Sequence, residues 1–142
     1  MKKKILLMTI TAWLAFVLQV IALPADDDKL IEGNWLIVEA QLGGQKMPDE
    51  GLKGHKLSLK DGKYSFDNDH GEYKIDPKAK IKSIDISGTE GPNKGRVILA
   101  IYELQDDTLK ICYDLEGKGR PKEFISKSGT KQFLVTYRRE KE

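Results

Sequence analysis

The stretch LSLKDGKYSFDNDHGEYKI, from Leu57 to Ile75, decides the fold class of this protein. Apolar side chains recur at every second position in three short runs, with serine or lysine between them. Asp61-Gly62 separates the first two runs and has the chemistry of a two-residue hairpin turn, and Asn68–Gly71 suits a second turn. The stretch therefore predicts successive β-hairpins with one buried face.

The same alternation continues along the chain on both sides of this stretch. From Asn34 onward, short alternating runs are separated by turn residues, and no helical period extends beyond two turns. We predict eight strands, at Asn34–Gln41, His55–Lys60, Lys63–Asp67, Glu72–Ile75, Ile81–Ser87, Arg96–Leu104, Thr108–Leu115 and Lys131–Arg139.

Eight strands joined in succession leave two sheet edges to protect. Closing the sheet removes both edges, so we predict an all-β, antiparallel, up-and-down eight-stranded barrel. A sandwich of two sheets built from the same strands is the alternative. The strand Arg96–Leu104 is apolar on both faces, which predicts an outer cover, either a loop or the segment Met47–Lys53.

The first 25 residues differ from the rest of the chain. Three lysines at positions 2–4 precede Ile5–Leu23, a run without charged residues. A basic start, an apolar middle and small residues at the end are typical of a secretory signal peptide, with cleavage after Ala22 or Ala25. An uncleaved membrane anchor is the alternative. We therefore predict a periplasmic or secreted domain at 26–142, with membrane contact only through an uncleaved leader.

The charge balance changes when the leader is set aside. The chain has 24 Lys and Arg against 22 Asp and Glu, and three of the lysines lie in the leader, which leaves 21 against 22, or a net charge of −1. Such a surface lacks the basic footprint of a nucleic-acid-binding protein, so we expect no nucleic acid partner. Cys112 is the single cysteine, which excludes an internal disulfide and a lipid anchor directly after the leader.

Trp35 is the only tryptophan after the leader, and it belongs to Gly33-Asn34-Trp35 at the start of the first predicted strand. This Gly-x-Trp resembles the signature of lipocalin-like barrels, in which the glycine permits a tight bend and the tryptophan plugs the closed end. The resemblance implies that an arginine of the last strand lies across the indole. Arg138 and Arg139 are both available, and such stacking contributes roughly 0.5–2 kcal/mol.

Three blocks extend the resemblance from about Leu30 to Lys141. Taken in order, LIEGNWLIVEAQLGGQKMPDE, GPNKGRVILAIYELQDDTLKIC and GKGRPKEF resemble a family of exported bacterial domains common in planctomycetes. That family is lipocalin-like in fold, so the resemblance implies a lipocalin-like eight-stranded barrel for residues 26–142. It brings no catalytic residues with it.

Residues able to hold a metal occur without the spacing of a metal site. The two histidines, His55 and His70, belong to no zinc motif. The segment DNDHGE, at 67–72, fails as a calcium loop, because loop positions six and twelve, counted from Asp67, hold Glu72 and Lys78 instead of glycine and glutamate, and it predicts a hairpin turn. Asp26-Asp27-Asp28 is expected to be a solvated acidic spacer. We predict no metal and no cofactor.

Candidate catalytic groups are similarly isolated. Cys112 lies two positions after Lys110 and so shares one face of the predicted strand with it. We expect Cys112 to be a packing residue rather than a nucleophile. The segment GTEGPNKGR, at 88–96, lacks the spacing of a phosphate-binding loop and the helix that would follow one. No paired nucleophile and base is recognisable, so we expect a protein that is not an enzyme.

Small barrels of this size are filled by side chains or hold one small ligand. We expect a monomeric, exported, non-catalytic binding module for a small apolar or amphiphilic ligand. The alternation selects five residues as pocket liners: Tyr64, Phe66, Tyr73, Ile101 and Tyr113.

The alternative function is a protein-interaction module with a solid core, such as an envelope protease inhibitor or an assembly factor. Its contacts with an envelope protein would come from the loops 43–54, 88–95 and 117–121. In the last of these loops and just after it, Lys118, Arg120 and Lys122 precede Phe124. This basic group is a candidate for binding an anionic ligand or partner.

Overall fold

The computed structural model describes residues 26–142, so the signal peptide predicted at 1–25 lies outside the described residues. No helix within 26–142 is long and apolar enough to cross a membrane. The described elements are α1 (Asp27–Leu30), β1 (Gly33–Leu42), β2 (Gln45–Lys46), the 3₁₀ turn η1 (Asp49–Gly51), β3 (Lys56–Lys60), β4 (Lys63–Phe66), β5 (Asp69–Asp76), β6 (Ser83–Glu90), β7 (Val97–Gln105), β8 (Thr108–Asp114) and β9 (Gln132–Arg139).

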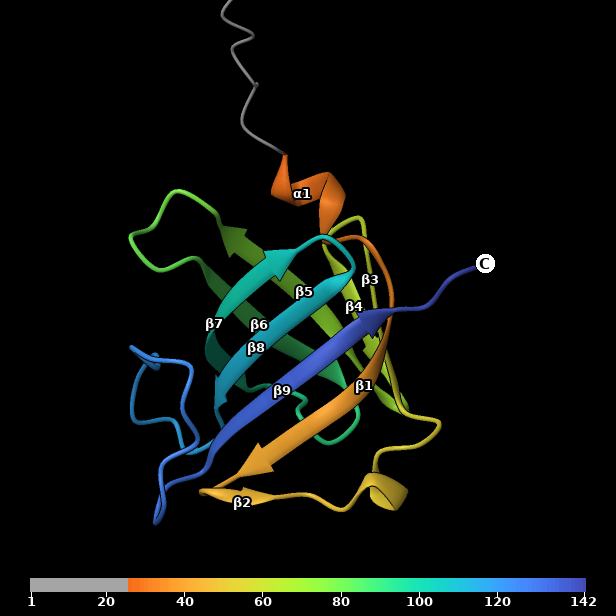
Figure 1. The fold of residues 1–142 in the computed structure, drawn as a ribbon. Helices are drawn as coiled ribbons and strands as arrows, with labels where there is room; N and C mark the ends of the chain where they lie inside the picture. Colours follow the sequence, from red (N-terminus) through yellow and green to blue (C-terminus); the bar gives the residue numbers. More distant parts are fainter. Residues whose placement is uncertain (1–25) are drawn as a thin grey trace, which may run out of the picture.

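Eight of the strands form a closed antiparallel barrel (Figure 1). β1 pairs with β3, and each following strand pairs with its successor as far as β9. β9 returns to β1, with Arg139 opposite Trp35 and Phe133 opposite Leu42, and this pairing closes the sheet. The short β2 pairs with the last two residues of β1. The predicted eight-stranded up-and-down barrel is confirmed, and the two-sheet sandwich is wrong.

Alternate side chains of every barrel strand point into the lumen, where they form one core. A buried aliphatic side chain of this kind stabilises the fold by about 1.5–3 kcal/mol. The residues of this core that are at most 1% exposed are Ile31, Trp35, Ala40, Leu59, Ile84, Ala100, Tyr102, Leu109, Ile111 and Val135.

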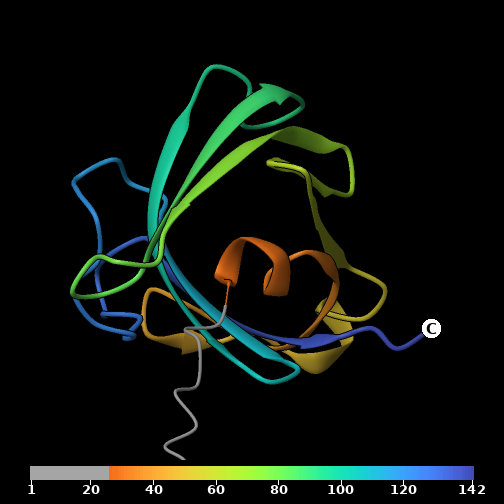
Figure 2. The ribbon, with the colours of Figure 1, turned by 90° about the horizontal axis from the view of Figure 1, so that it is seen from above.

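The short helix α1 lies across one end of the barrel (Figure 2). Its Asp27 is only 5% exposed, and one carboxylate oxygen accepts hydrogen bonds from the Tyr102 hydroxyl and from Nζ of Lys82, both at 2.7 Å. Burial, followed by the bond to Asp27, raises the pKa of Tyr102. The expectation of a solvated spacer is wrong for Asp27, because a buried hydroxyl of β7 provides its partner.

Replacing Asp27 by alanine is expected to lower the free energy of unfolding by about 1–3 kcal/mol, because the Tyr102 hydroxyl would be left buried without an acceptor. Asp28, the next residue of α1, is exposed, and Asp28→Ala is expected to change stability by less than about 0.5 kcal/mol. Urea unfolding of both variants measures the difference. Equal losses would contradict a specific role for the Asp27–Tyr102 hydrogen bond.

Trp35 is fully buried beside α1. Its ring N–H donates to the carbonyl of Ile31 at 2.9 Å, and the guanidinium carbon of Arg139 lies 4.2 Å from the centre of the indole. Arg139 also donates to the carbonyls of Leu30 and Glu32, at 2.6 and 2.7 Å. These contacts tie the segment between α1 and β1 to the last strand and close this end of the barrel.

Strand register decides which arginine meets the indole. The inward-pointing residues of this part of β9 are Val135, Tyr137 and Arg139. Arg138 therefore points outward and is exposed. The geometry at position 33 explains why the Gly-x-Trp sequence begins with glycine. Its φ is +140°, and a Cβ there would lie 2.7 Å from a guanidinium nitrogen of Arg139.

The segment 115–131 covers the outer face of β7 and β8 (Figure 1). Its Arg120 donates to the carbonyl of Ala100 at 2.8 Å and forms an ion pair with Asp85 of β6 at 2.6 Å. The Cys112 thiol, on the outer face of β8, lies 3.6 Å from the carbonyl oxygen of Ile125. This loop is therefore the outer cover of the strand with two apolar faces.

The other segment considered for that cover packs elsewhere. Within Met47–Lys53, Leu52 is buried and Met47 is partly buried, and both contact the main core inside the barrel. The backbone N–H of Met47 donates to the carbonyl of Ala40 in β1 at 2.8 Å. This segment therefore belongs to the side of the barrel near β1.

Candidate ligand-binding site

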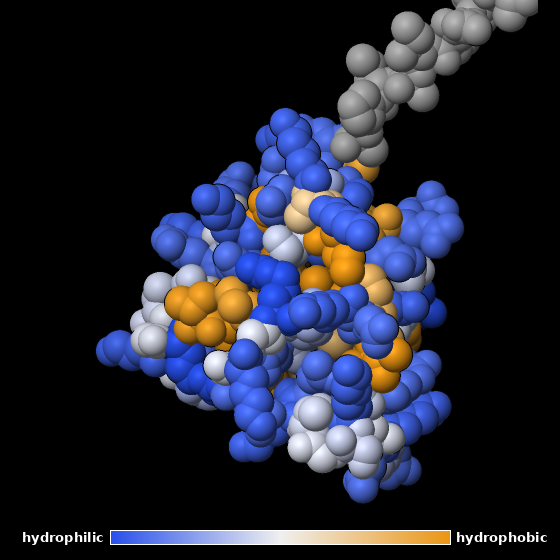
Figure 3. Space-filling model, turned by 90° about the vertical axis from the view of Figure 1, so that its left-hand side faces the viewer, coloured by the Kyte–Doolittle hydropathy of each residue, from blue (hydrophilic) through white to orange (hydrophobic). Residues whose placement is uncertain are grey.

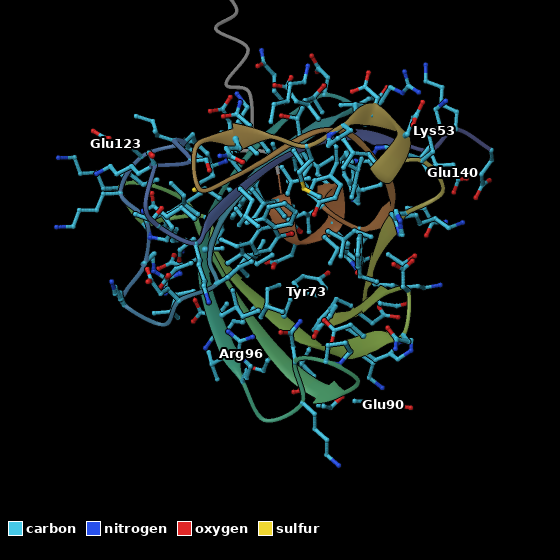
Figure 4. All side chains as sticks on the ribbon, turned by 90° about the horizontal axis from the view of Figure 1, so that it is seen from below. Lys53, Tyr73, Glu90, Arg96, Glu123 and Glu140 are labelled. Atoms are coloured by element: carbon cyan, nitrogen blue, oxygen red, sulfur yellow. The ribbon has the colours of Figure 1, made fainter. Side chains whose placement is uncertain are left out.

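A pocket of about 230 Å³ lies in the barrel at the end opposite α1. This volume is just below the range of about 300–1,000 Å³ for typical ligand pockets. Figure 4 looks along the barrel from this end, with Arg96 at the rim and Tyr73 deeper inside. The wall is formed by Leu57, Tyr64, Phe66, Asp69, Ile86, Asn93, Arg96, Ile98, Tyr113, Leu115, Phe133 and Tyr137.

Asp69 is the centre of a hydrogen-bonded cluster in this wall. Its buried carboxylate accepts from the Tyr64 hydroxyl at 3.2 Å and from the backbone and side-chain nitrogens of Asn93 at 3.2 and 2.6 Å. Arg96 in turn donates to Oδ1 of Asn93 and to the carbonyl of Leu115, at 3.1 and 2.9 Å. The cluster fixes the loop between β6 and β7 against β5 and the end of β8.

A second polar group in the wall is a pair of tyrosines. The hydroxyls of Tyr113 and Tyr137 lie 2.9 Å apart, and the Tyr113 ring stacks on Phe133 with 5.9 Å between ring centres. Burial raises the pKa of both tyrosines. Burial and the neighbouring Asp69 raise the pKa of Tyr64 to about 12. All three hydroxyls are therefore protonated at neutral pH and are able to donate a hydrogen bond.

Of the five predicted liners, Tyr64, Phe66 and Tyr113 line the pocket. Tyr73 packs against the core from β5 but lies outside the pocket wall, toward α1. Ile101 points outward and is buried beneath the segment 115–131. Both faces of β7 are apolar, so alternation alone could not show which of them is inside.

Three polar members of the wall were not predicted: Asp69, Asn93 and Arg96. The sequence placed a turn at 68–71, whereas the turn is at 67–68 and β5 begins at Asp69. Asp69 therefore points inward together with Gly71 and Tyr73. Its even spacing from these two residues was the sequence signal that could have identified it as a wall residue. The positions of Asn93 and Arg96 depend on the path of a loop, for which the sequence pattern gave no signal.

The basic group predicted as an interaction site is not assembled. Lys118 pairs with Glu116 at 3.2 Å, and Arg120 is bound to the barrel wall through Asp85. Lys122 is exposed. Figure 3 shows the side of the molecule with β6, β7 and 115–131, where apolar patches are interrupted by hydrophilic side chains. The exposed apolar side chains of these parts include Val97 and Ile125.

The candidate metal and catalytic residues lie on separate elements. Nδ1 of His55 is 2.7 Å from a carboxylate oxygen of Asp67, and the imidazole stacks on Phe66. His70 is on β5 and Cys112 is on the covered outer face of β8, where burial raises the pKa of its thiol. Among residues 26–142, no three His, Cys, Asp or Glu side chains are close enough to hold a metal ion.

The pocket thus has mostly apolar walls and two polar groups, and the barrel that contains it is closed at the α1 end. Most of its aromatic and aliphatic side chains come from six strands, β3, β4 and β6 to β9, whereas β5 contributes Asp69. Such a cavity suits a compact molecule with an apolar body and a small number of polar atoms.

Comparisons of the chain with protein-family models, curated proteins and solved structures found no match.

Proposed function

We propose that this protein is an exported, non-catalytic binding module that holds one small, partly apolar molecule in its barrel. The observation that carries the proposal is the 230 Å³ pocket, whose apolar wall contains convergent tyrosine, asparagine and aspartate side chains. Export through the leader and membership of the lipocalin-like exported family are part of the same proposal. The separation of His55, His70 and Cys112 supports a non-catalytic role.

The pocket favours this function over the interaction module. A protein that acts only through its loops needs no cavity, and a natural core is normally packed with few voids larger than a water molecule. In addition, Lys118 and Arg120 are engaged in local ion pairs. The plug of α1 and Trp35 closes one end, which leaves the opposite end as the route for a ligand.

Filling the pocket is expected to weaken ligand binding at least about ten-fold. Ile98 lines the pocket, and its neighbour Val97 points outward and is 62% exposed. Ile98→Phe adds a ring inside the cavity, where overpacking costs about 1–3 kcal/mol, and Val97→Phe adds the same ring outside. Binding of a panel of small amphiphiles is measured by calorimetry on the purified protein and both variants.

The proposal requires loss of binding in Ile98→Phe and retention in Val97→Phe. Native mass spectrometry of protein isolated from its own host complements the panel, since a co-purified molecule identifies the ligand directly. Equal binding by both variants would place the ligand elsewhere. A complete absence of binding would favour the interaction module, with the exposed loops as its contacts.

A further inference from the structure

The two pocket tyrosines hold a hydrogen-bond donor without a partner. Two phenol hydroxyls carry two protons, and the bond between Tyr113 and Tyr137 uses one of them. Within the described part of the chain, neither hydroxyl makes another hydrogen bond. Tyr137 is only 2% exposed, and Tyr113 is partly buried. A buried donor without an acceptor is costly, so the second proton favours a ligand with an acceptor atom.

The other polar groups of the wall are already engaged. Asp69 accepts three hydrogen bonds from Tyr64 and Asn93, and Arg96 donates to Asn93 and Leu115. The remaining donors of Arg96 lie at the exposed rim, where water can accept from them. The tyrosine pair is therefore a partly buried position of the pocket with a donor that no described protein atom accepts, and Tyr137 is its more buried member.

The charge of the wall favours an uncharged ligand. Asp69 and Arg96 are the charged residues of the described wall, and their charges are opposite. A carboxylate ligand would lose its water close to the buried Asp69, and an ionised group without a close counterion is costly to bury. A neutral acceptor, such as a carbonyl oxygen, avoids this cost and still accepts the tyrosine proton.

We infer that the pocket selects compact, uncharged, mainly apolar molecules with a carbonyl-type acceptor, which accepts the free proton of the Tyr113–Tyr137 pair. This inference rests on the proposed function, because it names the ligand class of the same pocket. It assigns the two tyrosines the role of specificity-determining residues. The apolar remainder of the ligand contacts the aliphatic and aromatic wall.

Two ligand series of matched shape test the inference. The aromatic series is acetophenone, isopropenylbenzene and benzoate, and the aliphatic series is 2-octanone, 2-methyl-1-octene and heptanoate. In each series, the second compound replaces the carbonyl oxygen by a methylene group and the third carries a charge. Dissociation constants are measured at neutral pH by NMR titration, followed on the methyl signals of Ile86 and Ile98, which line the pocket.

The variants are Tyr113→Phe, Tyr137→Phe, the double variant and the control Tyr73→Phe, whose hydroxyl lies outside the pocket wall. The preference for ketone over alkene is expected to fall about ten-fold in the double variant. Each single variant is expected to keep most of this preference, because the remaining hydroxyl retains its own proton. Tyr73→Phe is expected to leave it unchanged, and thermal melting verifies that all four variants are folded.

An unchanged ketone preference in the double variant would overturn the role of the tyrosine pair. Tighter binding of the carboxylates than of the ketones would overturn the choice of an uncharged ligand. If none of the six compounds binds, the ligand class is wrong. The amphiphile panel with Ile98→Phe then shows separately whether the pocket binds any small molecule, so the two failures are distinguishable.

Discussion

Raising the pH from about 9 to about 11 is expected to unfold this protein, because its tyrosines ionise more readily in the unfolded chain. All five have a raised pKa, chiefly through burial: Tyr64, Tyr73, Tyr102, Tyr113 and Tyr137. A raised pKa means that the folded state favours the neutral phenol. The resulting stability is complete below the unfolded pKa of about 10 and is lost as the pH rises above it.

The loss is comparable to the whole stability of a small domain. Each strongly shifted tyrosine removes roughly 1.4 kcal/mol per pH unit above about 10. For Tyr64, Tyr102, Tyr113 and Tyr137, whose pKa values are raised most, this amounts to roughly 5 kcal/mol at about pH 11, against a typical total of about 5–15 kcal/mol. Circular dichroism and tyrosinate absorbance, recorded in one titration, measure unfolding and ionisation together.

The two signals are expected to change in a single transition. Tyr102→Phe removes one of the shifted groups and is expected to make the loss of stability with pH less steep. Gradual ionisation near pH 10 with an unchanged circular dichroism spectrum would show that the hydroxyls are accessible in the folded state. That result would contradict the burial on which this prediction depends.

Replacing Trp35 by alanine is expected to lower the free energy of unfolding by about 3–5 kcal/mol, the usual cost of removing a large buried aromatic side chain. The substitution removes the fully buried indole, its hydrogen bond to Ile31 and the surface on which Arg139 stacks. Urea unfolding measures the loss. Val38→Ala, at an exposed position of the same strand, is expected to cost less than about 1 kcal/mol.

Trp35→Phe provides a second measurement if the alanine variant does not fold. It keeps an aromatic face for Arg139 but has no ring N–H for the carbonyl of Ile31, and it is expected to lose less than Trp35→Ala. Comparable losses in Trp35→Ala and Val38→Ala would show that the plug contributes little to the stability of the barrel.

The parts of the fold that depend on local patterns could be predicted from the sequence. Alternation such as Leu57/Leu59 and Tyr64/Phe66 gave the strands, and the short turns gave their antiparallel order. The position of Trp35 in Gly-x-Trp indicated the plug. The choice of Arg139 over Arg138 follows from the same alternation once the inward face of β9 is known, because Tyr137 and Arg139 share it.

The parts of the site that depend on contacts between distant segments were harder to predict from the sequence. Asp69 lies next to a turn, and the exact residues of that turn decide which side chains of β5 point inward. A shift of the turn by one residue would move every inward side chain to the outer face. Asn93 reaches Asp69 across 24 positions of the chain. Ile101 was placed inside because the cover of 115–131, which buries the outer face of β7, has no periodic pattern of its own.

The pairing of β1 with β9 also determines how the molecule can be attached to other objects. The start of β1 lies beside the end of β9 at the barrel end closed by α1 (Figure 1), so both ends of the described chain leave from that side. The pocket lies at the opposite side. A fusion partner, a fluorescent label or a solid support joined to either end therefore leaves the mouth of the pocket facing free solution.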